Sequence, residues 1–250
     1  MSRPLVVRFE DAEVIVVEKP AGVHAAPLRS AEGGTLLERV IESYPEVAEV
    51  PGIKAVEPGL LHRLDRETSG LVAIARTPAA FAALREIAAR GGMRKEYLAA
   101  CARPADSRLA DSEAIGAAFG RALRIASRCA PYGSGRRMVR VVLAGETRDK
   151  LLRSATPDSY STEAEIIRQG PAALLLRARL DRGFRHQVRA HLSFLGFPIL
   201  GDLLYGTPVP PGVIERLYLH ASRLQFDHPG TGAPISVESP MPEEFGALFE

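Results

Sequence analysis

Cysteines are scarce in this 250-residue sequence, which contains only Cys101 and Cys129. The two lie far apart and show none of the paired spacing of a disulfide framework or of zinc ligands. We therefore expect neither a disulfide nor a metal site. The same scarcity fits the reducing environment of the cytoplasm, which is the location we expect.

Long apolar runs are missing as well. No apolar segment approaches the roughly 20 residues that are needed to span a bilayer. Glu10, Asp11 and Glu13 interrupt the N-terminal segment, where a leader peptide would place its apolar core. The sequence thus predicts neither export nor insertion into a membrane.

The excess of positive charge is small, because 32 Lys and Arg residues face 30 Asp and Glu residues, for a net charge of +2. That excess is too mild to indicate nucleic-acid binding, so any electrostatic footprint must be local. Residues 121–153 provide one, since their only acidic side chains are Glu146 and Asp149. Two interpretations stay open for this basic insertion: a solvated segment, or an arm that contacts phosphates. Its basic residues are Arg121, Arg124, Arg128, Arg136, Arg137, Arg140, Arg148, Lys150 and Arg153.

Signatures of a bound cofactor are absent too. The glycine pairs at 33–34 and 91–92 lack the strand-to-helix setting of a phosphate-binding loop. A separation of five residues does not align His186 and His191 on a helix as metal ligands would require. We therefore expect no cofactor and no metal.

Strand-like runs are scattered among few helical segments. Strands are predicted at 5–9, 14–17, 71–75, 97–101, 162–167, 174–180 and 217–226. Strands that do not alternate strictly with helices favour the α+β class over a doubly wound sheet. The length suits one well-buried domain, and we expect a single domain over residues 1–250.

Two segments carry the signals of helices. Residues 78–90 follow the potential cap Thr77, begin with a proline and stop before a glycine pair. Residues 185–195 form the second predicted helix, which also ends at a glycine. Within it Arg185 and Arg189 are four residues apart, so we expect them to share a face that is offset from the apolar stripe.

The most informative string is HRLDRETSG at residues 62–70. Asp65 stands between Arg63 and Arg66, and a turn signal and an apolar run follow directly. This pattern favours an ionised carboxylate that is held for a task. On its own the string also fits a surface ion pair or a turn-capping Asp, since Asx and Ser/Thr turns are common.

Three further strings accompany it: EKPAGVH at 18–24, KEY at 95–97, and GFRHQVRAHL at 183–192, which precedes GFPILGD at 196–202. In this order and spacing the set closely resembles the RluA-type pseudouridine synthases, from about residue 13 to about residue 226. Any one string occurs by chance, and the ordered set carries the resemblance.

The resemblance implies a pseudouridine synthase fold, with a mixed, largely antiparallel central sheet, flanking helices and loops, and an active-site cleft across the sheet. It implies that uridine in structured RNA, ribosomal or transfer, is converted to its carbon-linked isomer. Nothing is oxidised, reduced or added in this reaction, so it requires no cofactor. RNA is the expected partner, and we expect a monomer without a protein partner or a membrane.

The resemblance also assigns the catalytic roles. It implies that Asp65 attacks the ribose or removes a sugar proton, and that Arg189 pairs with it. Burial alone would raise the pKa of the carboxyl, whereas a nearby cation stabilises its anionic form. Tyr97 is implied to stack on the target base, and Leu219 to pack beneath the uracil. A strand tyrosine with its hydroxyl at the rim and a core leucine are the alternative interpretations.

Other basic residues are assigned to the RNA. A base that is stacked in an RNA helix must be flipped out to reach the carboxylate, and Arg63 is the candidate for the vacated position. His62 is assigned to substrate binding. Phosphate contacts are predicted for Lys19, Arg66, Lys95 and the basic insertion 121–153.

The chain departs from the family pattern in two respects. The family usually has Gly-Arg-Thr or Gly-Arg-Ser before His-Gln, whereas here Phe184 follows the glycine. Arg185 is the candidate stand-in, although a shift of one residue is about 100° around a helix. Many relatives begin with a separate RNA-binding module, and here strand-like sequence starts almost at once. We therefore expect the catalytic domain itself to choose the substrate.

Two alternative functions remain in view. Phe184 motivates an RNA-binding protein of the same fold that has lost catalysis. A glycoside or nucleoside hydrolase would need two carboxylates about 5 to 10 Å apart. Glu67 and Asp181 are the only nearby motif acids, and neither has an evident acid-donor setting.

Overall fold

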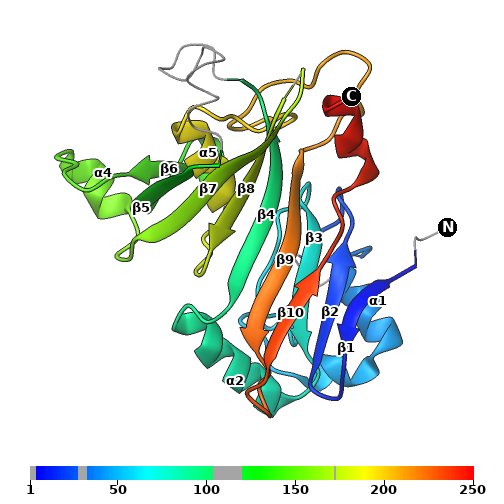
Figure 1. Ribbon diagram of the computed structural model, residues 1–250. Coiled ribbons are helices and arrows are strands. Elements are labelled where there is room, and N and C mark those ends of the chain that lie inside the picture. Colours follow the sequence, from blue (N-terminus) through cyan, green and yellow to red (C-terminus); the bar gives the residue numbers. More distant parts are fainter. Residues whose placement is uncertain (1–3, 28–32, 104–119, 172) are drawn as a thin grey trace. The chain divides into compact units, whose positions relative to one another are not determined.

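A computed structural model describes residues 4–27, 33–103, 120–171 and 173–250 (Figure 1). The chain divides into two compact units. The first unit comprises Met1–Lys95 and His220–Pro240, and the second comprises Glu96–Leu219 and Met241–Glu250. A single domain over residues 1–250 stays a prediction.

The first unit contains a mixed sheet with the strand order β1-β2-β3-β9, to which β10 adds beside β9. The pairs β1–β2, β2–β3 and β9–β10 are antiparallel, and only β3–β9 is parallel. The strands are β1 (Val6–Glu10), β2 (Val14–Lys19), β3 (Ser69–Ala75), β9 (Leu219–Asp227) and β10 (Pro234–Glu238).

Gly70 permits the parallel pairing of β3 with β9. Its register places Ser69 opposite His220 and Gly70 opposite Ala221. Gly70 has a φ of +116°, which favours glycine, and a Cβ there would overlap the backbone of Ala221. This residue therefore allows the two strands to approach closely at the start of β3.

Helix α2 (Pro78–Ala89) packs against one face of this sheet. Thr77 caps α2 through its side chain, as predicted. Phe81, Leu84 and Ile87 of this helix join the buried core formed by β2 and β3. Two helical segments that the sequence did not predict precede β3: α1 (Leu36–Ser43) and the 3-10 helix η1 (Pro45–Glu49).

The second unit contains its own strand order, β4-β8-β7-β5-β6. The pairs β5–β6, β5–β7 and β7–β8 are antiparallel. The strands are β4 (Arg94–Cys101, which begins in the first unit), β5 (Ala122–Tyr132), β6 (Met138–Val142), β7 (Tyr160–Gln169) and β8 (Leu174–Leu180). The helices are α4 (Asp149–Ser154), α5 (Gln187–Phe194) and the 3-10 helices η2 (Ser134–Arg136) and η3 (Glu243–Leu248).

Polar contacts fix α5 against the sheet of the second unit. The buried imidazole of His191 hydrogen bonds Ser127 Oγ at 2.9 Å and Thr162 Oγ1 at 2.8 Å. The Gln187 amide donates to the carbonyl oxygen of Ser161 at 2.8 Å and to Thr162 Oγ1 at 3.1 Å. These contacts tie the helix to β5 and β7, so its side chains have fixed positions.

The α+β prediction is confirmed, and every predicted strand range overlaps a strand of the structure. The sequence did not predict β5, β6 or β10. β5 and β6 lie in the basic insertion, where the sequence indicated only a charged segment. Among the described residues, no helix has the length and apolar character to cross a membrane.

The predicted helix at 185–195 begins too early. His186 has a left-handed backbone with a φ of +56°, and α5 starts only at Gln187. Arg185 therefore lies before the helix and does not share a helical face with Arg189. The turn is stabilised by the Phe184 backbone N–H, which donates to Gln187 Oε1 at 2.8 Å.

We predict that Gly70→Ala destabilises the protein by about 3 kcal/mol, because the new Cβ meets the Ala221 backbone and the positive φ is strained. Gly232→Ala is the control, since Gly232 also has a positive φ but no atom within 4 Å of the new Cβ. Urea unfolding measures both. Equal losses of stability for the two variants would contradict the close approach of β3 and β9.

We also predict that His191 makes folding dependent on pH. Burial lowers the pKa of His191 to about 4, below the value of about 6.5 for an unfolded histidine. Between these values the unfolded chain binds more protons, so the free energy of unfolding falls as the pH drops below about 6.5. At pH 5 this group should account for a loss of about 2 kcal/mol. Urea unfolding at pH 7.5 and pH 5 should show a smaller difference for His191→Gln than for the wild type.

Candidate active site

The turn that carries Asp65 is anchored to the end of β2. The carbonyl oxygen of Arg66 accepts hydrogen bonds from Lys19 Nζ and from the Gly22 backbone N–H, both at 2.9 Å. Arg66 Nε donates in return to the Gly22 carbonyl oxygen at 3.0 Å. The Thr68 N–H closes the turn on the Asp65 carbonyl oxygen at 3.1 Å. The Asp65 side chain is half-buried, directly before the buried strand β3.

Lys19 is completely buried. Its ammonium group donates to the backbone carbonyl oxygens of Pro20 at 2.9 Å, Val23 at 2.6 Å and Arg66 at 2.9 Å. An ammonium group has three hydrogens to donate. The structure therefore departs from the predicted phosphate contact of Lys19, because burial and these carbonyls give it a structural role at the Asp65 turn.

Arg63 is paired through one terminal nitrogen of its guanidinium group and remains partly exposed. Its Nη1 donates to Glu57 Oε1 at 2.6 Å, and Glu57 is buried whereas 42% of the Arg63 side chain is exposed. A guanidinium group has five donor hydrogens in a planar fork. The pair with Glu57 orients this fork and leaves a large part of it accessible from solvent.

His62 and Lys95 place two basic groups near the same turn. The Ala73 backbone N–H donates to His62 Nε2 at 3.1 Å, so the ring proton lies on Nδ1. This buried Nδ1 has no hydrogen-bond partner among the described residues. Burial, and then the charge of Lys95, lower the pKa of His62 well below its usual value. Burial also lowers the pKa of Lys95 to about 8.

Arg189 lies in the second unit and forms a buried, bidentate ion pair with Asp202. Its Nε and Nη2 each donate to one carboxylate oxygen at 2.7 Å. Asp202 also accepts from the backbone N–H groups of Leu204 at 2.9 Å and Tyr205 at 3.1 Å. Burial would raise the pKa of Asp202, but Arg189 and the two amides outweigh it and hold this pKa below the usual value.

Tyr205 links this ion pair to β6. The Arg189 guanidinium carbon lies 5.3 Å from the centre of the Tyr205 ring, which is within the range of a cation–π contact. The Tyr205 hydroxyl accepts from the Val139 N–H at 2.5 Å and hydrogen bonds His186 Nδ1 at 3.0 Å. Burial raises the pKa of Tyr205 to about 12, so it stays protonated at neutral pH.

The sequence assigned no role to Asp202 or Tyr205. The sequence pattern that could have identified them is GDLLYG at residues 201–206, in which the carboxylate of Asp202 precedes the aromatic ring of Tyr205 by three positions. That spacing lets the Asp202 side chain bind the turn that carries Tyr205 while it also holds Arg189.

Two further predicted residues, Tyr97 and Leu219, are buried on strands. Tyr97 is 8% exposed on β4, and Leu219 is 3% exposed at the start of β9. Both belong to the second unit, as do Arg185 and Arg189, whereas Asp65, His62, Arg63 and Lys95 belong to the first unit. The pairing of Asp65 with Arg189 and the stacking role of Tyr97 stay predictions.

The basic insertion is folded, and its arginines divide into two groups. Several bind within the second unit: Arg124 pairs with Glu163 at 2.7 Å, Arg148 pairs with Glu146, and Arg128 donates to carbonyl oxygens at the end of α4. The second group consists of exposed arginines at and after the β5–β6 turn: Arg136, Arg137 and Arg140.

Arg185 lies against this exposed group. Its Nη2 donates to the carbonyl oxygen of Arg136 at 2.7 Å. Arg140 lies over the Tyr132 ring, with 4.7 Å between the guanidinium carbon and the ring centre. Phe184, at the unusual position, packs against Tyr160 with their ring centres 5.2 Å apart. Phe184 thus contributes to packing, and the adjacent Arg185 reaches the tip of the hairpin.

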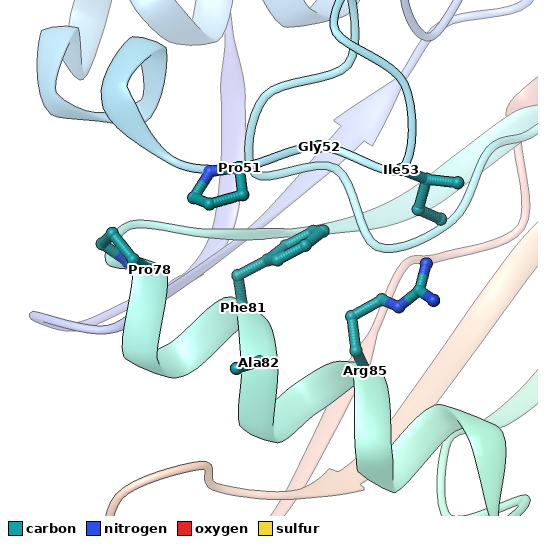
Figure 2. Close-up of a pocket in the computed structure, with 7 residues that line it drawn as sticks. All are labelled: Pro51, Gly52, Ile53, Pro78, Phe81, Ala82 and Arg85. Atoms are coloured by element: carbon teal, nitrogen blue, oxygen red, sulfur yellow. The ribbon is translucent and has the colours of Figure 1, made fainter.

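A separate pocket lies in the first unit, beside α2. Figure 2 shows the Phe81 ring between the helix and the loop of Pro51 to Ile53, with Arg85 near the edge. None of the residues that the sequence assigned to a site lines it. In the described parts of the chain, no three His, Cys, Asp or Glu side chains lie close enough together to hold a metal ion.

Comparison with known proteins agrees with the resemblance seen in the sequence. Residues 13–194 match the family model described as RNA pseudouridylate synthase. The chain is 30% identical over 253 residues to ribosomal large subunit pseudouridine synthase D of Pseudomonas aeruginosa, covering 96% of this chain and 69% of that protein. It is 31% identical to the protein of the same name from Xanthomonas campestris, covering 98% of this chain and 69% of that protein.

Solved structures share the fold. Human RNA pseudouridylate synthase domain containing 4 has a TM-score of 0.67 at 19% identity, covering 96% of this chain and 90% of that one. Human RNA pseudouridylate synthase domain containing 1 has a TM-score of 0.65 at 20% identity, covering 94% and 83%. The predicted fold class is therefore confirmed.

We predict that Asp202→Asn destabilises the protein by about 3 kcal/mol. Removal of one charge from a buried ion pair costs far more stability than removal of one charge from an exposed pair. Asp158→Asn is the matched control, because Asp158 is paired with Arg182 at 2.9 Å but both side chains are exposed. Urea unfolding at pH 7 compares the two. A loss for Asp202→Asn as small as that for the control would contradict the structural weight given to this pair.

Proposed function

This chain belongs to the RNA pseudouridylate synthase family and is an enzyme that isomerises uridine in RNA, and from this premise we propose that Asp65 is its catalytic carboxylate. The observation that carries the proposal is the anchored turn, in which Lys19 and Gly22 both bind the carbonyl oxygen of Arg66. A reacting carboxylate needs a fixed position to meet the ribose in the correct geometry. Of the two carboxylates on this turn, Asp65 is half-buried whereas Glu67 is exposed.

The reaction breaks the bond between the base nitrogen and the ribose, rotates the base and joins the sugar to ring carbon 5. Asp65 acts in its ionised form, either by attack on the ribose or by removal of a sugar proton. Arg189 supplies the cation that stabilises this ionised form. Asp202 supports the role by orienting the Arg189 guanidinium through two hydrogen bonds of 2.7 Å each.

The target uridine must leave the RNA helix, at a cost of a few kcal/mol. Arg63 occupies the vacated position, and its pair with Glu57 supports this role by holding one terminal nitrogen of the guanidinium. Tyr97 stacks on the flipped uracil and Leu219 packs beneath it. Stacking on an aromatic ring recovers about 1–3 kcal/mol per base, enough to offset much of the cost of flipping.

Phosphate groups bind at two basic surfaces. Near Asp65, the Lys95 ammonium supplies a positive charge, and His62 belongs to the substrate-binding residues. In the second unit, the hairpin arginines Arg136, Arg137 and Arg140 are exposed, and Arg185 lies against them. Such contacts position RNA without reading its sequence.

The substrate that we propose is large-subunit ribosomal RNA. The support is the name of the relatives from Pseudomonas aeruginosa and Xanthomonas campestris, which are ribosomal large subunit enzymes. Transfer RNA is the second substrate to be tested. The enzyme is proposed to act as a cytoplasmic monomer without a protein partner, which size-exclusion chromatography with light scattering tests directly.

The decisive experiment measures tritium release from RNA labelled at uracil carbon 5, because the new carbon–carbon bond expels that hydrogen. Bacterial large-subunit ribosomal RNA and transfer RNA transcripts are tested in parallel. We expect release by the wild type from ribosomal RNA and none by Asp65→Ala. Glu67→Ala is the matched control, an exposed carboxylate on the same turn, and should release tritium at the wild-type rate.

Each other outcome identifies a different function. Binding of RNA without release by the wild type would favour a protein of this fold that has lost catalysis. Free uracil among the products, with loss of activity in Glu67→Ala, would favour hydrolysis. Full activity in Asp65→Ala would overturn the catalytic role of Asp65.

The lowered pKa of Lys95 predicts a pH dependence of RNA binding. Its ammonium is charged below a pH of about 8 and neutral above it, so affinity for the ribosomal RNA transcript should fall as the pH rises through 8. Arginine stays charged throughout this range. Filter-binding titrations at pH 7 and pH 9 should therefore show a smaller loss for Lys95→Arg than for the wild type. The same loss in both proteins would remove Lys95 from the phosphate-binding role.

A further inference from the structure

A chain of hydrogen bonds runs through the interior of the first unit. Ser69 Oγ lies 2.9 Å from His220 Nδ1, and His220 Nε2 lies 3.0 Å from Ser239 Oγ. Ser239 Oγ then donates to Glu18 Oε2 at 2.8 Å. Ser69, His220 and Ser239 are all buried, with 6%, 0% and 4% of their surface exposed. We call these four residues the Ser69–Glu18 relay.

The relay has a defined direction. A carboxylate can only accept hydrogen bonds, so the Ser239 hydroxyl donates its hydrogen to Glu18. The Ser239 oxygen then accepts a hydrogen bond from His220. The proton of a neutral His220 ring therefore lies on Nε2. Nδ1 is then an acceptor, and it receives the hydrogen of the Ser69 hydroxyl. Each donor has one acceptor, which makes the relay fully satisfied.

Tertiary structure alone assembles the relay. The parallel pairing of β3 with β9 places Ser69 directly opposite His220, and the missing Cβ of Gly70 allows it. Ser239 follows β10, and its backbone N–H donates to the Ser222 carbonyl oxygen at 2.8 Å. The four residues thus come from β2, β3, β9 and the end of β10.

The relay ends beside the anchor of the Asp65 turn. Glu18 and Lys19 are consecutive residues at the end of β2. Glu18 holds the relay, which fixes Ser69 just after the turn, while Lys19 binds the Arg66 carbonyl oxygen within the turn. Lys19 therefore holds the segment at Arg66, and the relay connects its other end, Ser69, to the neighbouring Glu18.

We propose that His220 and Ser239 are positioning residues, which set the rate of the reaction by fixing the Asp65 turn through Ser69. This inference rests on the proposed catalytic role of Asp65. Both residues are buried and act from a distance, so they affect turnover and leave RNA affinity unchanged. A displacement of about 1 Å at a reacting group can cost on the order of 100-fold in rate.

The first test compares Ser239→Ala with Ser236→Ala, a matched control whose serine is exposed on β10. Tritium release from the ribosomal RNA transcript gives kcat and KM, filter binding gives the RNA Kd, and thermal unfolding gives Tm. We expect Ser239→Ala to lower kcat about 10- to 100-fold. Its KM and Kd should stay within about twofold of the control. An unchanged kcat, or a Kd that weakens in parallel, overturns the proposal.

A double-variant comparison separates positioning from general weakening. If Ser239 and His220 act through one relay, the combination of Ser239→Ala with His220→Asn should lower kcat no further than His220→Asn alone. Independent structural damage would instead multiply the two losses in kcat. Multiplied losses would thus contradict the relay.

A measurement without RNA keeps the test independent of the enzyme's activity. Nitrogen-15 NMR of the wild type should show His220 as the neutral tautomer with its proton on Nε2. Hydrogen exchange of the Thr68 amide should be faster in Ser239→Ala than in Ser236→Ala. A proton on Nδ1, or equal exchange in the two variants, overturns the relay even if Asp65→Ala is inactive. Full activity of Asp65→Ala would instead overturn the catalytic role of Asp65, and with it the positioning role, while the hydrogen bonds of the relay would stand.

Discussion

The arrangement of the first unit depends on a buried ammonium group. Burying a charge in a protein costs several kcal/mol unless hydrogen bonds replace the lost water. Lys19 meets this requirement with three backbone carbonyls, and one of them belongs to Arg66 in the Asp65 turn. A shift of the turn would therefore deprive the ammonium of a partner. Because the buried ammonium needs the Arg66 carbonyl oxygen, Lys19 fixes the position of the turn that carries Asp65.

The second unit also buries a basic side chain, but there the acceptor is a carboxylate instead of backbone carbonyls. Arg189 is buried on α5, and Asp202 binds it through two hydrogen bonds while also capping the turn that leads to Tyr205. Contacts of His191 and Gln187 hold the helix itself against β5 and β7. In both units, a long basic side chain is held by fixed acceptors within a loop or helix end.

Much of the fold was accessible from the sequence because its signals are local. The β8 range, the cap at Thr77 and the strands around Asp65 follow from apolar runs, a hydroxyl before a proline and a turn signal. β5 escaped prediction because residues such as Ala122 and Ala126 have low strand propensity. The start of α5 was misplaced because histidine adopts a left-handed backbone only rarely, so the residue type alone did not predict the one at His186.

The sequence by itself determined the family, the α+β class and the candidate catalytic residues, because these depend on an ordered set of strings, each of which is short and continuous in the chain. Only the tertiary structure decided what each basic residue binds. It placed Lys19 in the interior, engaged Arg128 within the protein and left Arg136 and Arg137 exposed. It also joined Ser69 to His220, 151 positions apart. Burial and hydrogen-bond partners depend on chain segments that are distant in sequence, so no local pattern could specify them.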